Sequence, residues 1–346
     1  MFMLCYKVTL SLLLLTVKFS EIKALPDVEK EIQISCVSNE NATEFSIFHL
    51  KYDPIMAKHG YTFFEGEIEK LKEMIGHREK IIFFFLGHED FLHKISGKSF
   101  LIAKEQASKT GATACTISYD FLGDVNELLK FSQYFWSLDK RIPRVVEMAS
   151  SFIQNIVDSK HFKITLSSVY LTGFCLGGHV AGMVGNKLRE IYKGHMVSAV
   201  WAFDPPAVGF PHSEISGKPR RVQKGDAKFV GVFHTSTIGF NDTVADVDII
   251  VNGAELQPGC QFERIKTACS HFSGFILREL IVMESEQLDN GKLIVHGANK
   301  SDQFTVDLTN PPHDKKGVYH VQTGMIFETK TEGFLRRMSN SFLKTK

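Results

Sequence analysis

The chain has 346 residues, of which 44% are hydrophobic and 23% are charged, and its formal net charge is +1. This length and composition suit a globular protein with a large buried core. A near-neutral balance without a basic cluster argues against nucleic acid as a partner, because neutralising phosphates needs an excess of Lys and Arg.

Residues 1–24 predict a cleaved secretory signal peptide. Lys7 precedes an apolar run, Val8 to Val17, and polar residues follow the run. The run is about half of the roughly 20 residues that a membrane-spanning helix needs, so we expect cleavage between Ser20 and Leu25. A short N-terminal anchor or a core helix is the alternative. In a secreted, extracellular protein the N-x-[ST] sequons are candidate glycosylation sites, and they lie at Asn41, Asn241 and Asn299.

Secretion favours disulfides, and the cysteine count is informative. Six cysteines are present, and Cys5 would leave with the signal peptide. The remaining five are Cys36, Cys115, Cys175, Cys260 and Cys269. Because five is odd, at least one thiol must stay unpaired or bond to another molecule.

Strand-like and helix-like segments alternate along the chain. We expect strands within residues 31–50, 79–90, 112–121, 168–174, 195–203 and 227–235, and helices over 99–110, 141–159 and 178–192. This alternation predicts an α/β fold with a mostly parallel central sheet flanked by helices. No linker divides residues 25–346, which favours a single domain. The last 75 or so residues are too few for a typical β-sandwich of about 100, so we expect them to complete the sheet.

The segment "VYLTGFCLGGHVAG" has the spacing of a nucleophile turn between a strand and a helix. Gly173 and Gly177 stand two residues before and after Cys175, where a Cβ would collide as the chain reverses. The following helix N-terminus favours negative charge at residue 175. Close packing of a strand against a helix is the alternative explanation of these glycines.

Two further residues follow in the order that a hydrolase of this kind requires, nucleophile, acid and histidine. Asp204 ends the next expected strand in "WAFDPPAVGF", and His271 lies in "CSHF". Each alone could be structural, since Asp204 could cap a turn and the chain has 14 histidines. Together, and in this order, they predict a Cys175–His271–Asp204 triad.

These motifs resemble those of the secreted animal lipases of the pancreatic lipase type, including insect sn-1 phospholipases and fly yolk proteins. The family elbow G-H-S-L-G-A-H-x-A-G compares with "GFCLGGHVAG", its acid motif L-D-P-A-x-P-x-F with "FDPPAVGF", and its C-x-H with "CSH". The likeness covers about residues 40–325 and is strongest over 79–325. It implies an α/β-hydrolase fold without a separate C-terminal β-sandwich domain.

The resemblance also implies further features of the site. The eight residues 261–268 would form a short, phospholipase-like lid closed by a Cys260–Cys269 disulfide. Cys36 and Cys115 are then the second candidate pair, which leaves Cys175 as the odd thiol. The backbone N–H groups of His88 and Leu176 would form the oxyanion hole. Cys260, Cys269 and His271 lack a fourth ligand at a recognised spacing, so we expect no metal, and we expect no cofactor.

Three departures from the family pattern bear on activity. Cysteine replaces the nucleophilic serine at residue 175, Leu86 and His88 replace a histidine and an aromatic residue at the oxyanion turn, and Ser118 replaces an aspartate. A helix N-terminus and a histidine can activate a thiol as the thiolate. Sulfur is larger than oxygen, however, and misplacing one oxyanion donor costs roughly 2.7–4 kcal/mol.

Two functions remain open. The first is hydrolysis of a carboxylic ester of a lipid or phospholipid through the Cys-His-Asp triad. The second is a catalytically silent lipase-fold protein that binds or stores lipid, as the resemblance to yolk proteins implies. In either case the expected partner is a lipid or phospholipid, and the mixed basic and apolar tail "EGFLRRMSNSFLKTK" could contact a membrane surface.

Overall fold

The computed structural model describes residues 32–38, 41–53, 60–87, 96–119, 134–135, 137–211, 219–240, 242–299 and 301–324. The expected signal peptide, His88, Asn241 and the C-terminal tail lie outside these residues. The boundaries of the single domain therefore stay a prediction. Asn41 and Asn299 are both exposed, and their glycosylation also stays a prediction.

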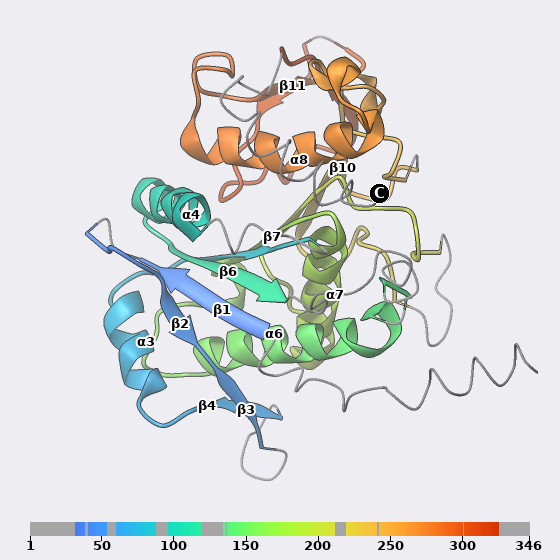
Figure 1. The fold of residues 1–346 in the computed structure, drawn as a ribbon. Coiled ribbons are helices and arrows are strands. Elements are labelled where there is room, and N and C mark those ends of the chain that lie inside the picture. The colour runs from blue at the N-terminus through green and yellow to red at the C-terminus, as the bar shows by residue number, and fades with distance from the viewer. Residues whose placement is uncertain are drawn as a thin grey trace, which may run out of the picture.

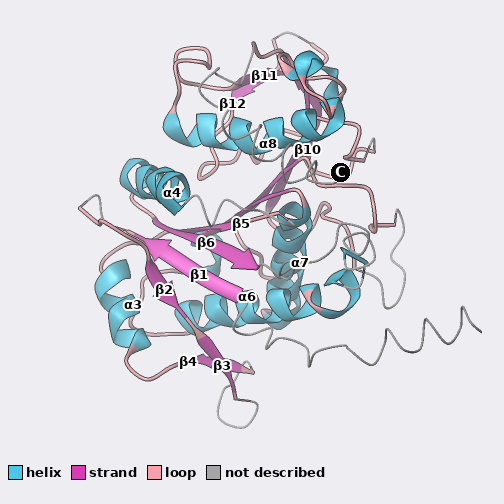
Figure 2. Ribbon diagram, viewed as in Figure 1, coloured by secondary structure: helices cyan, strands magenta, loops and turns pink. Residues whose placement is uncertain are grey.

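One large sheet runs through the middle of the molecule (Figures 1 and 2). Its strand order is β12-β11-β13-β10-β9-β8-β7-β5-β6-β1-β2, and a separate hairpin pairs β3 with β4. The strands are β1 (Ile32–Val37), β2 (Ser46–Phe48), β3 (Leu50–Tyr52), β4 (Tyr61–Phe63), β5 (Ile81–Phe85), β6 (Thr113–Tyr119), β7 (Val169–Phe174), β8 (Ala199–Phe203), β9 (Phe229–His234), β10 (Val247–Val251), β11 (Ile294–His296), β12 (Gln303–Thr305) and β13 (Gly317–Val321). The helices are α3 (Glu67–Ile75), α4 (Ser96–Thr110), α6 (Ile142–Val157), α7 (Leu176–Ile191) and α8 (Lys266–Met283).

The seven strands from β13 to β6 in this order pair with one another in parallel. The pairs outside them, at both edges of the sheet, are antiparallel. The expected mostly parallel sheet is therefore confirmed. As expected, the last strands complete the sheet instead of forming a β-sandwich. The helix expected over 99–110 begins at Ser96, and the helix expected from residue 178 begins at Leu176.

The apolar strand β5 explains why the sheet is buried on both faces. Phe83 and Phe85 pack in the core with α6 and α7, whereas Ile82 and Phe84 pack on the opposite face with α8. Figure 1 shows α6 and α7 on one side of the sheet and α4 and α8 on the other. A strand that is apolar on both faces is thus covered by helices on both sides of the sheet.

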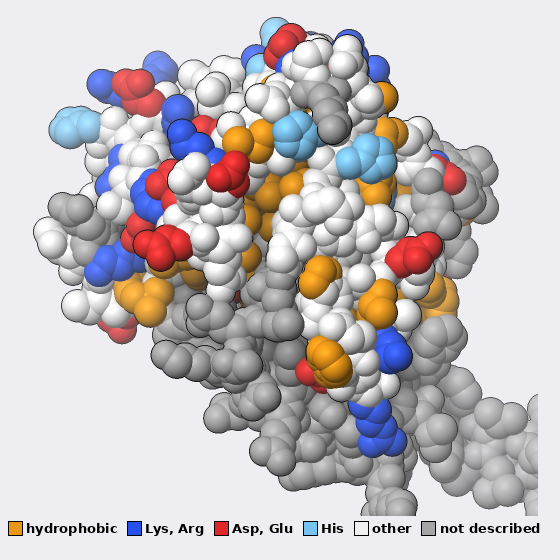
Figure 3. Space-filling model, turned by 90° about the horizontal axis from the view of Figure 1, so that it is seen from above, with side chains coloured by type: hydrophobic (Ala, Val, Ile, Leu, Met, Phe, Trp, Pro, Cys, Tyr) orange, Lys and Arg blue, Asp and Glu red, His pale blue; other side chains and the backbone are white. Residues whose placement is uncertain are grey.

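The molecular surface agrees with the near-neutral composition. In Figure 3, acidic and basic side chains are interspersed around the face seen from above, and hydrophobic side chains gather toward its middle. Within the described part of the chain, no helix is both long enough and apolar enough to cross a bilayer.

Candidate active site

Cys175 lies at a sharp turn between β7 and α7. Its backbone has φ 55° and ψ −130°, a conformation that costs a non-glycine residue about 1–3 kcal/mol. Its backbone N–H donates to the carbonyl oxygen of Phe203 at 3.0 Å, which extends the pairing of β7 with β8 by one residue. The chain then reverses, and the half-buried Cys175 stands at the N-terminal end of α7.

The glycines on both sides of Cys175 are needed for close backbone contact. A Cβ on Gly173 would lie 2.1 Å from the Gly177 carbonyl oxygen, and a Cβ on Gly177 would lie 2.1 Å from the Phe85 carbonyl oxygen. Both distances are far below van der Waals contact. The spacing predicts that a Cβ at either glycine would collide, and the structure adds that the turn packs closely against the end of β5.

Asp204 lies just after β8, with φ 48°, and its side chain is fully buried. Its Oδ1 accepts hydrogen bonds from the backbone N–H groups of Thr235 at 2.6 Å and Ser236 at 3.0 Å. Its Oδ2 accepts the Ser236 hydroxyl at 2.5 Å. These bonds fix the carboxylate and orient its second oxygen toward α8.

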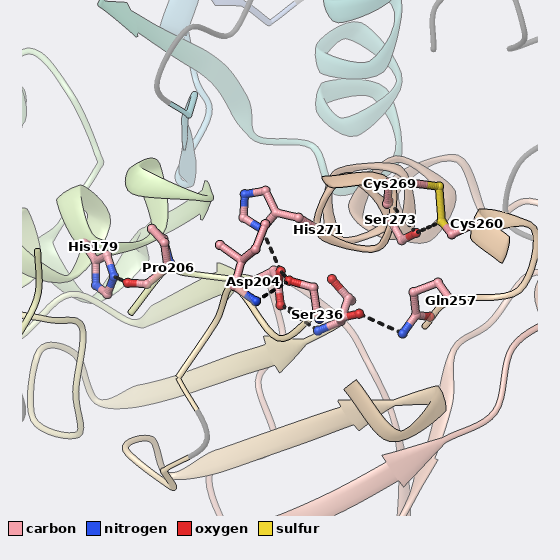
Figure 4. Close-up of polar contacts among 11 residues, drawn as sticks. His179, Asp204, Pro206, Ser236, Gln257, Cys260, Cys269, His271 and Ser273 are labelled. Atoms are coloured by element: carbon pink, nitrogen blue, oxygen red, sulfur yellow. Dashed lines mark hydrogen bonds and ion pairs between the residues drawn. A yellow bond between two sulfur atoms is a disulfide. The ribbon is translucent and has the colours of Figure 1, made fainter. Parts of the chain in front are cut away.

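His271 completes the group from α8 (Figure 4). Its Nδ1 donates to Asp204 Oδ2 at 2.6 Å, although 67 residues separate the two in sequence. Burial alone would lower the pKa of His271. The negative charge of Cys175, hydrogen bonds to Asp204 and Cys175, and the Asp204 charge outweigh burial and raise the pKa to about 10. The structure therefore brings the three residues of the predicted triad together, and an imidazolium is favoured at neutral pH.

An aromatic ring covers His271. Phe174, the residue before the elbow cysteine, has its ring centroid 4.9 Å from that of His271. Aromatic faces attract cations through their quadrupole. Phe174 stands where the family elbow has histidine, so this position changes together with the nucleophile.

Gln257 links the supports of the acid to those of the histidine. It is buried, and its Nε2 donates to the carbonyl oxygens of Thr235 and Val251, both at 2.8 Å. Its backbone N–H donates to the Ser270 hydroxyl at 3.0 Å. Thr235 binds Asp204 and Ser270 precedes His271, so Gln257 fixes the relative positions of the two triad members (Figure 4).

His179 plays a structural part on the other side of the elbow. Its Nε2 donates to the Pro206 carbonyl oxygen at 2.8 Å, and its Nδ1 accepts the Val222 N–H at 3.0 Å. Its ring stacks on Phe210 with centroids 3.6 Å apart. Burial lowers the pKa of His179 to about 3, with a minor contribution from the nearby Arg221 charge, so the ring is neutral. It ties α7 to the loop that follows Asp204.

The oxyanion turn can be followed in part. Leu176 is the first residue of α7, so its N–H has no acceptor within the helix. His88 lies outside the described residues. Tyr119, next to the substituted Ser118, donates its hydroxyl to the Leu86 carbonyl oxygen at 2.6 Å and thereby holds the start of this turn.

Both candidate disulfides are present. Cys36 of β1 and Cys115 of β6 are directly opposed and bonded, and Cys260 is bonded to Cys269 across residues 261–268. Cys175 is the free cysteine among the residues that the structure describes. Two disulfides fit an extracellular protein. In the same described ranges, no group of three or more His, Cys, Asp or Glu residues is arranged to hold a metal ion.

Sequence reasoning missed the residues that support the triad. Ser236, Thr235 and Gln257 are single polar residues in irregular segments, which give no periodic signal. Phe174 lies within the quoted elbow motif but is not among the three departures named from the sequence, and its contact with His271 was not foreseen.

A mostly parallel sheet, with a strained turn after β7 and a buried carboxylate after β8, defines an α/β-hydrolase. Comparison with known proteins narrows this class. The lipase family model matches residues 129–275. The chain is 28% identical to phospholipase A1 of Vespula vulgaris over 190 residues, which are 54% of each chain.

Other relatives point the same way. Phospholipase A1 1 of Dolichovespula maculata is 30% identical over 38% of this chain and 42% of its own length. Lipase member H-B of Xenopus laevis is 29% identical over 44% of this chain and 31% of its own. The chain thus spans about half the length of the Vespula vulgaris relative and less than half of the other two. The resemblance to animal lipases and phospholipases A1 is confirmed.

Solved structures are more distant. An S-formylglutathione hydrolase from Agrobacterium tumefaciens aligns with a TM-score of 0.33 and 14% identity, over 71% of this chain and 82% of that chain.

Proposed function

We propose that the protein is a secreted carboxylic-ester hydrolase that cleaves acyl esters of lipids or phospholipids. Cys175 is the nucleophile, His271 the general acid and base, and Asp204 the carboxylate that orients His271. The observation that carries the proposal is the 2.6 Å bond from His271 Nδ1 to the buried Asp204, with Cys175 raising the pKa of the same imidazole.

In the acylation step, the Cys175 thiolate attacks the ester carbonyl carbon. The electrons of the C=O bond move to oxygen, and the N–H groups of Leu176 and His88 stabilise the oxyanion. When the C–O bond to the alcohol breaks, the His271 imidazolium protonates the leaving oxygen. The products of this step are a free alcohol and an acyl thioester on Cys175.

Water then resolves the thioester. Acylation removes the negative charge of Cys175, which is one of the causes that raise the pKa of His271. The neutral imidazole can therefore take a proton from water as the water oxygen attacks the thioester carbon. The carboxylic acid is released, the thiolate leaves, and the resting ion pair is restored.

The segment between Cys260 and Cys269 supports a lipid substrate. Phe262 is 82% exposed, Ile265 is 41% exposed, and nearby Leu256 is 43% exposed. Exposed apolar residues beside a candidate site suit contact with a lipid surface. The relatives named phospholipase A1 support the same substrate class.

The test is hydrolysis of phospholipid, galactolipid and short acyl esters by the purified native protein, beside Cys175→Ala and Cys175→Ser. We expect the native protein to be active and the alanine variant to lose at least a hundredfold, because the thioester cannot form. Equal activity of the native and alanine proteins would refute a catalytic thiol.

The loss of the serine favours the second candidate, a silent lipase-fold protein that binds lipid. In that case the native and alanine proteins are equally silent, and Cys175→Ser gains activity. The native protein still binds lipid vesicles. Comparing the native protein with Cys175→Ala and Cys175→Ser therefore distinguishes the two functions.

A further inference from the structure

The outermost hairpin of the sheet, β11 with β12, joins the hydrogen-bonded ladder of the sheet through a single residue pair. Only His296 and His320 pair β11 with β13, whereas five pairs join β13 to β10. The shortest strand pairing in this part of the sheet is therefore made by two histidines.

The two side chains lie on the same, open face of the sheet. Directly opposed residues of antiparallel strands share a face, with Cβ atoms about 4.5–5.5 Å apart. Val295 and Tyr319, their neighbours in sequence, are buried on the opposite face, in the core cluster that also contains residues of α8, whereas His296 and His320 are both exposed. Both line one cavity of about 990 Å³, together with Asp289 and Gln303.

Neither imidazole is engaged elsewhere. Within the ranges that the structure describes, neither the His296 side chain nor the His320 side chain has a hydrogen bond, ion pair or ring contact. Gln303 is the next residue in the same row, because it pairs with His296 across the hairpin. Two unengaged imidazoles and an amide therefore follow one another over three strands.

Two opposed imidazoles suit a late first-row divalent ion. Zinc, for example, binds an imidazole nitrogen at about 2.0–2.1 Å. Two imidazole rings on adjacent strands can both reach one ion at this distance. Mg²⁺ and Ca²⁺ prefer oxygen ligands and are not expected here. Two protein ligands leave coordination positions for water, and no group of three or more His, Cys, Asp or Glu residues is arranged for a metal in the described part of the chain.

We propose that His296 and His320 form a surface site for Zn²⁺, Cu²⁺ or Ni²⁺ that clips the β11–β12 hairpin to β13. This departs from the expectation of no metal and does not involve the triad. Binding to the native pairing stabilises the folded protein by mass action, since the unfolded chain does not hold the two rings together. We expect the added stability to be greatest in the hairpin, because only one residue pair joins it to the strand ladder.

The test uses the full-length protein carrying Cys175→Ala, so that the active-site thiol cannot bind metal. The probe is ZnCl₂, with MgCl₂ and CaCl₂ beside it. Calorimetry gives the zinc affinity, thermal unfolding gives the shift in Tm, and hydrogen exchange reports protection of residues 294–305. His296→Ala and His320→Ala remove one ligand each, and His195→Ala, another exposed histidine, is the matched control.

We expect Zn²⁺ to raise the Tm and slow exchange in residues 294–305, and EDTA to reverse both effects. Each of His296→Ala and His320→Ala weakens zinc binding at least tenfold while leaving the Tm in EDTA near that of the parent, and His195→Ala changes neither. Absence of zinc binding, or binding that survives loss of either histidine, overturns the proposal. A variant that loses Tm in EDTA is replaced by the glutamine substitution, which keeps a polar side chain on the strand.

Discussion

Replacing Asp204 with asparagine tests how the carboxylate acts. The side chain keeps its size, and the asparagine oxygen can still accept the N–H groups of Thr235 and Ser236 that now lie 2.6 Å and 3.0 Å from Oδ1. At the Oδ2 position an NH₂ group takes the place of an acceptor. The His271 Nδ1–H and the Ser236 hydroxyl, at 2.6 Å and 2.5 Å, must then both reorient.

The substitution changes which tautomer of His271 is favoured. To accept from the new amide, Nδ1 must give up its proton, and neutral His271 then carries its proton on Nε2. The loss of the carboxylate charge also lowers the pKa of His271, which Asp204 helps to raise. Substitutions of this kind in serine triads lower kcat on the order of 10⁴-fold.

Alkylation of Cys175 measures the effect without a substrate. At pH 6 an ordinary thiol of pKa about 8.5 is less than 1% thiolate, so losing the imidazolium lowers the iodoacetamide rate by roughly a hundredfold. Peptide mapping by mass spectrometry locates the label on Cys175. The matched control is Asp248→Asn, because Asp248 and His234 form another buried pair at 2.9 Å outside the triad.

The expected result is a slow Asp204→Asn protein and a native-like rate in the Asp248→Asn protein. If Asp204→Asn reacts as fast as the native protein at pH 6, His271 does not hold Cys175 as a thiolate, and the proposed mechanism is wrong. If both variants slow equally, the effect is a general loss of folding, which the unfolding midpoint of each variant reveals.

Three other outcomes are expected. Phe174→Leu removes the ring at 4.9 Å and about 0.5–2 kcal/mol of cation–π attraction, so NMR titration should show a lower His271 pKa; an unchanged value contradicts this role. Because burial lowers the His179 pKa from 6.5 to about 3, its contribution to stability is complete above pH 6.5 and declines by up to about 5 kcal/mol toward pH 3. Urea unfolding across this range should show less acid loss in His179→Gln than in the native protein. Gly177→Ala places a Cβ 2.1 Å from the Phe85 carbonyl oxygen and should cost roughly 3 kcal/mol or more in thermal unfolding; a Tm within a degree of native would contradict the packing.

The sequence predicts the parts of the fold whose residues repeat with a clear period. The central strands are apolar runs, and α6 has one apolar face, so both were expected. Helix α8 was not, because residues on all sides of it are buried, among them Phe272, Gly274 and Glu279. Without a polar face, a helix shows no amphipathic period.

The candidate site divides in the same way. The order of Cys175, Asp204 and His271 was readable because the first two follow consecutive strands of a parallel sheet. The supports were not readable, since Gln257 bonds to three segments that come together only in the folded chain. Local patterns reveal strand ends, whereas contacts between distant loops depend on the whole packing.

The backbone around the triad concentrates its strain at the two residues that follow strand ends. Cys175 and Asp204 have φ values of 55° and 48°, and each such residue costs about 1–3 kcal/mol. Both remain tied to the neighbouring strand, through Cys175 N–H to the Phe203 carbonyl oxygen at 3.0 Å and Asp204 N–H to that of Phe233 at 2.8 Å. The backbone therefore directs both side chains toward His271, whether the side chain of residue 175 ends in sulfur or in oxygen. Exchanging sulfur for oxygen by Cys175→Ser leaves this backbone unchanged, so a difference in turnover between the two proteins reports the chemistry of the nucleophile alone.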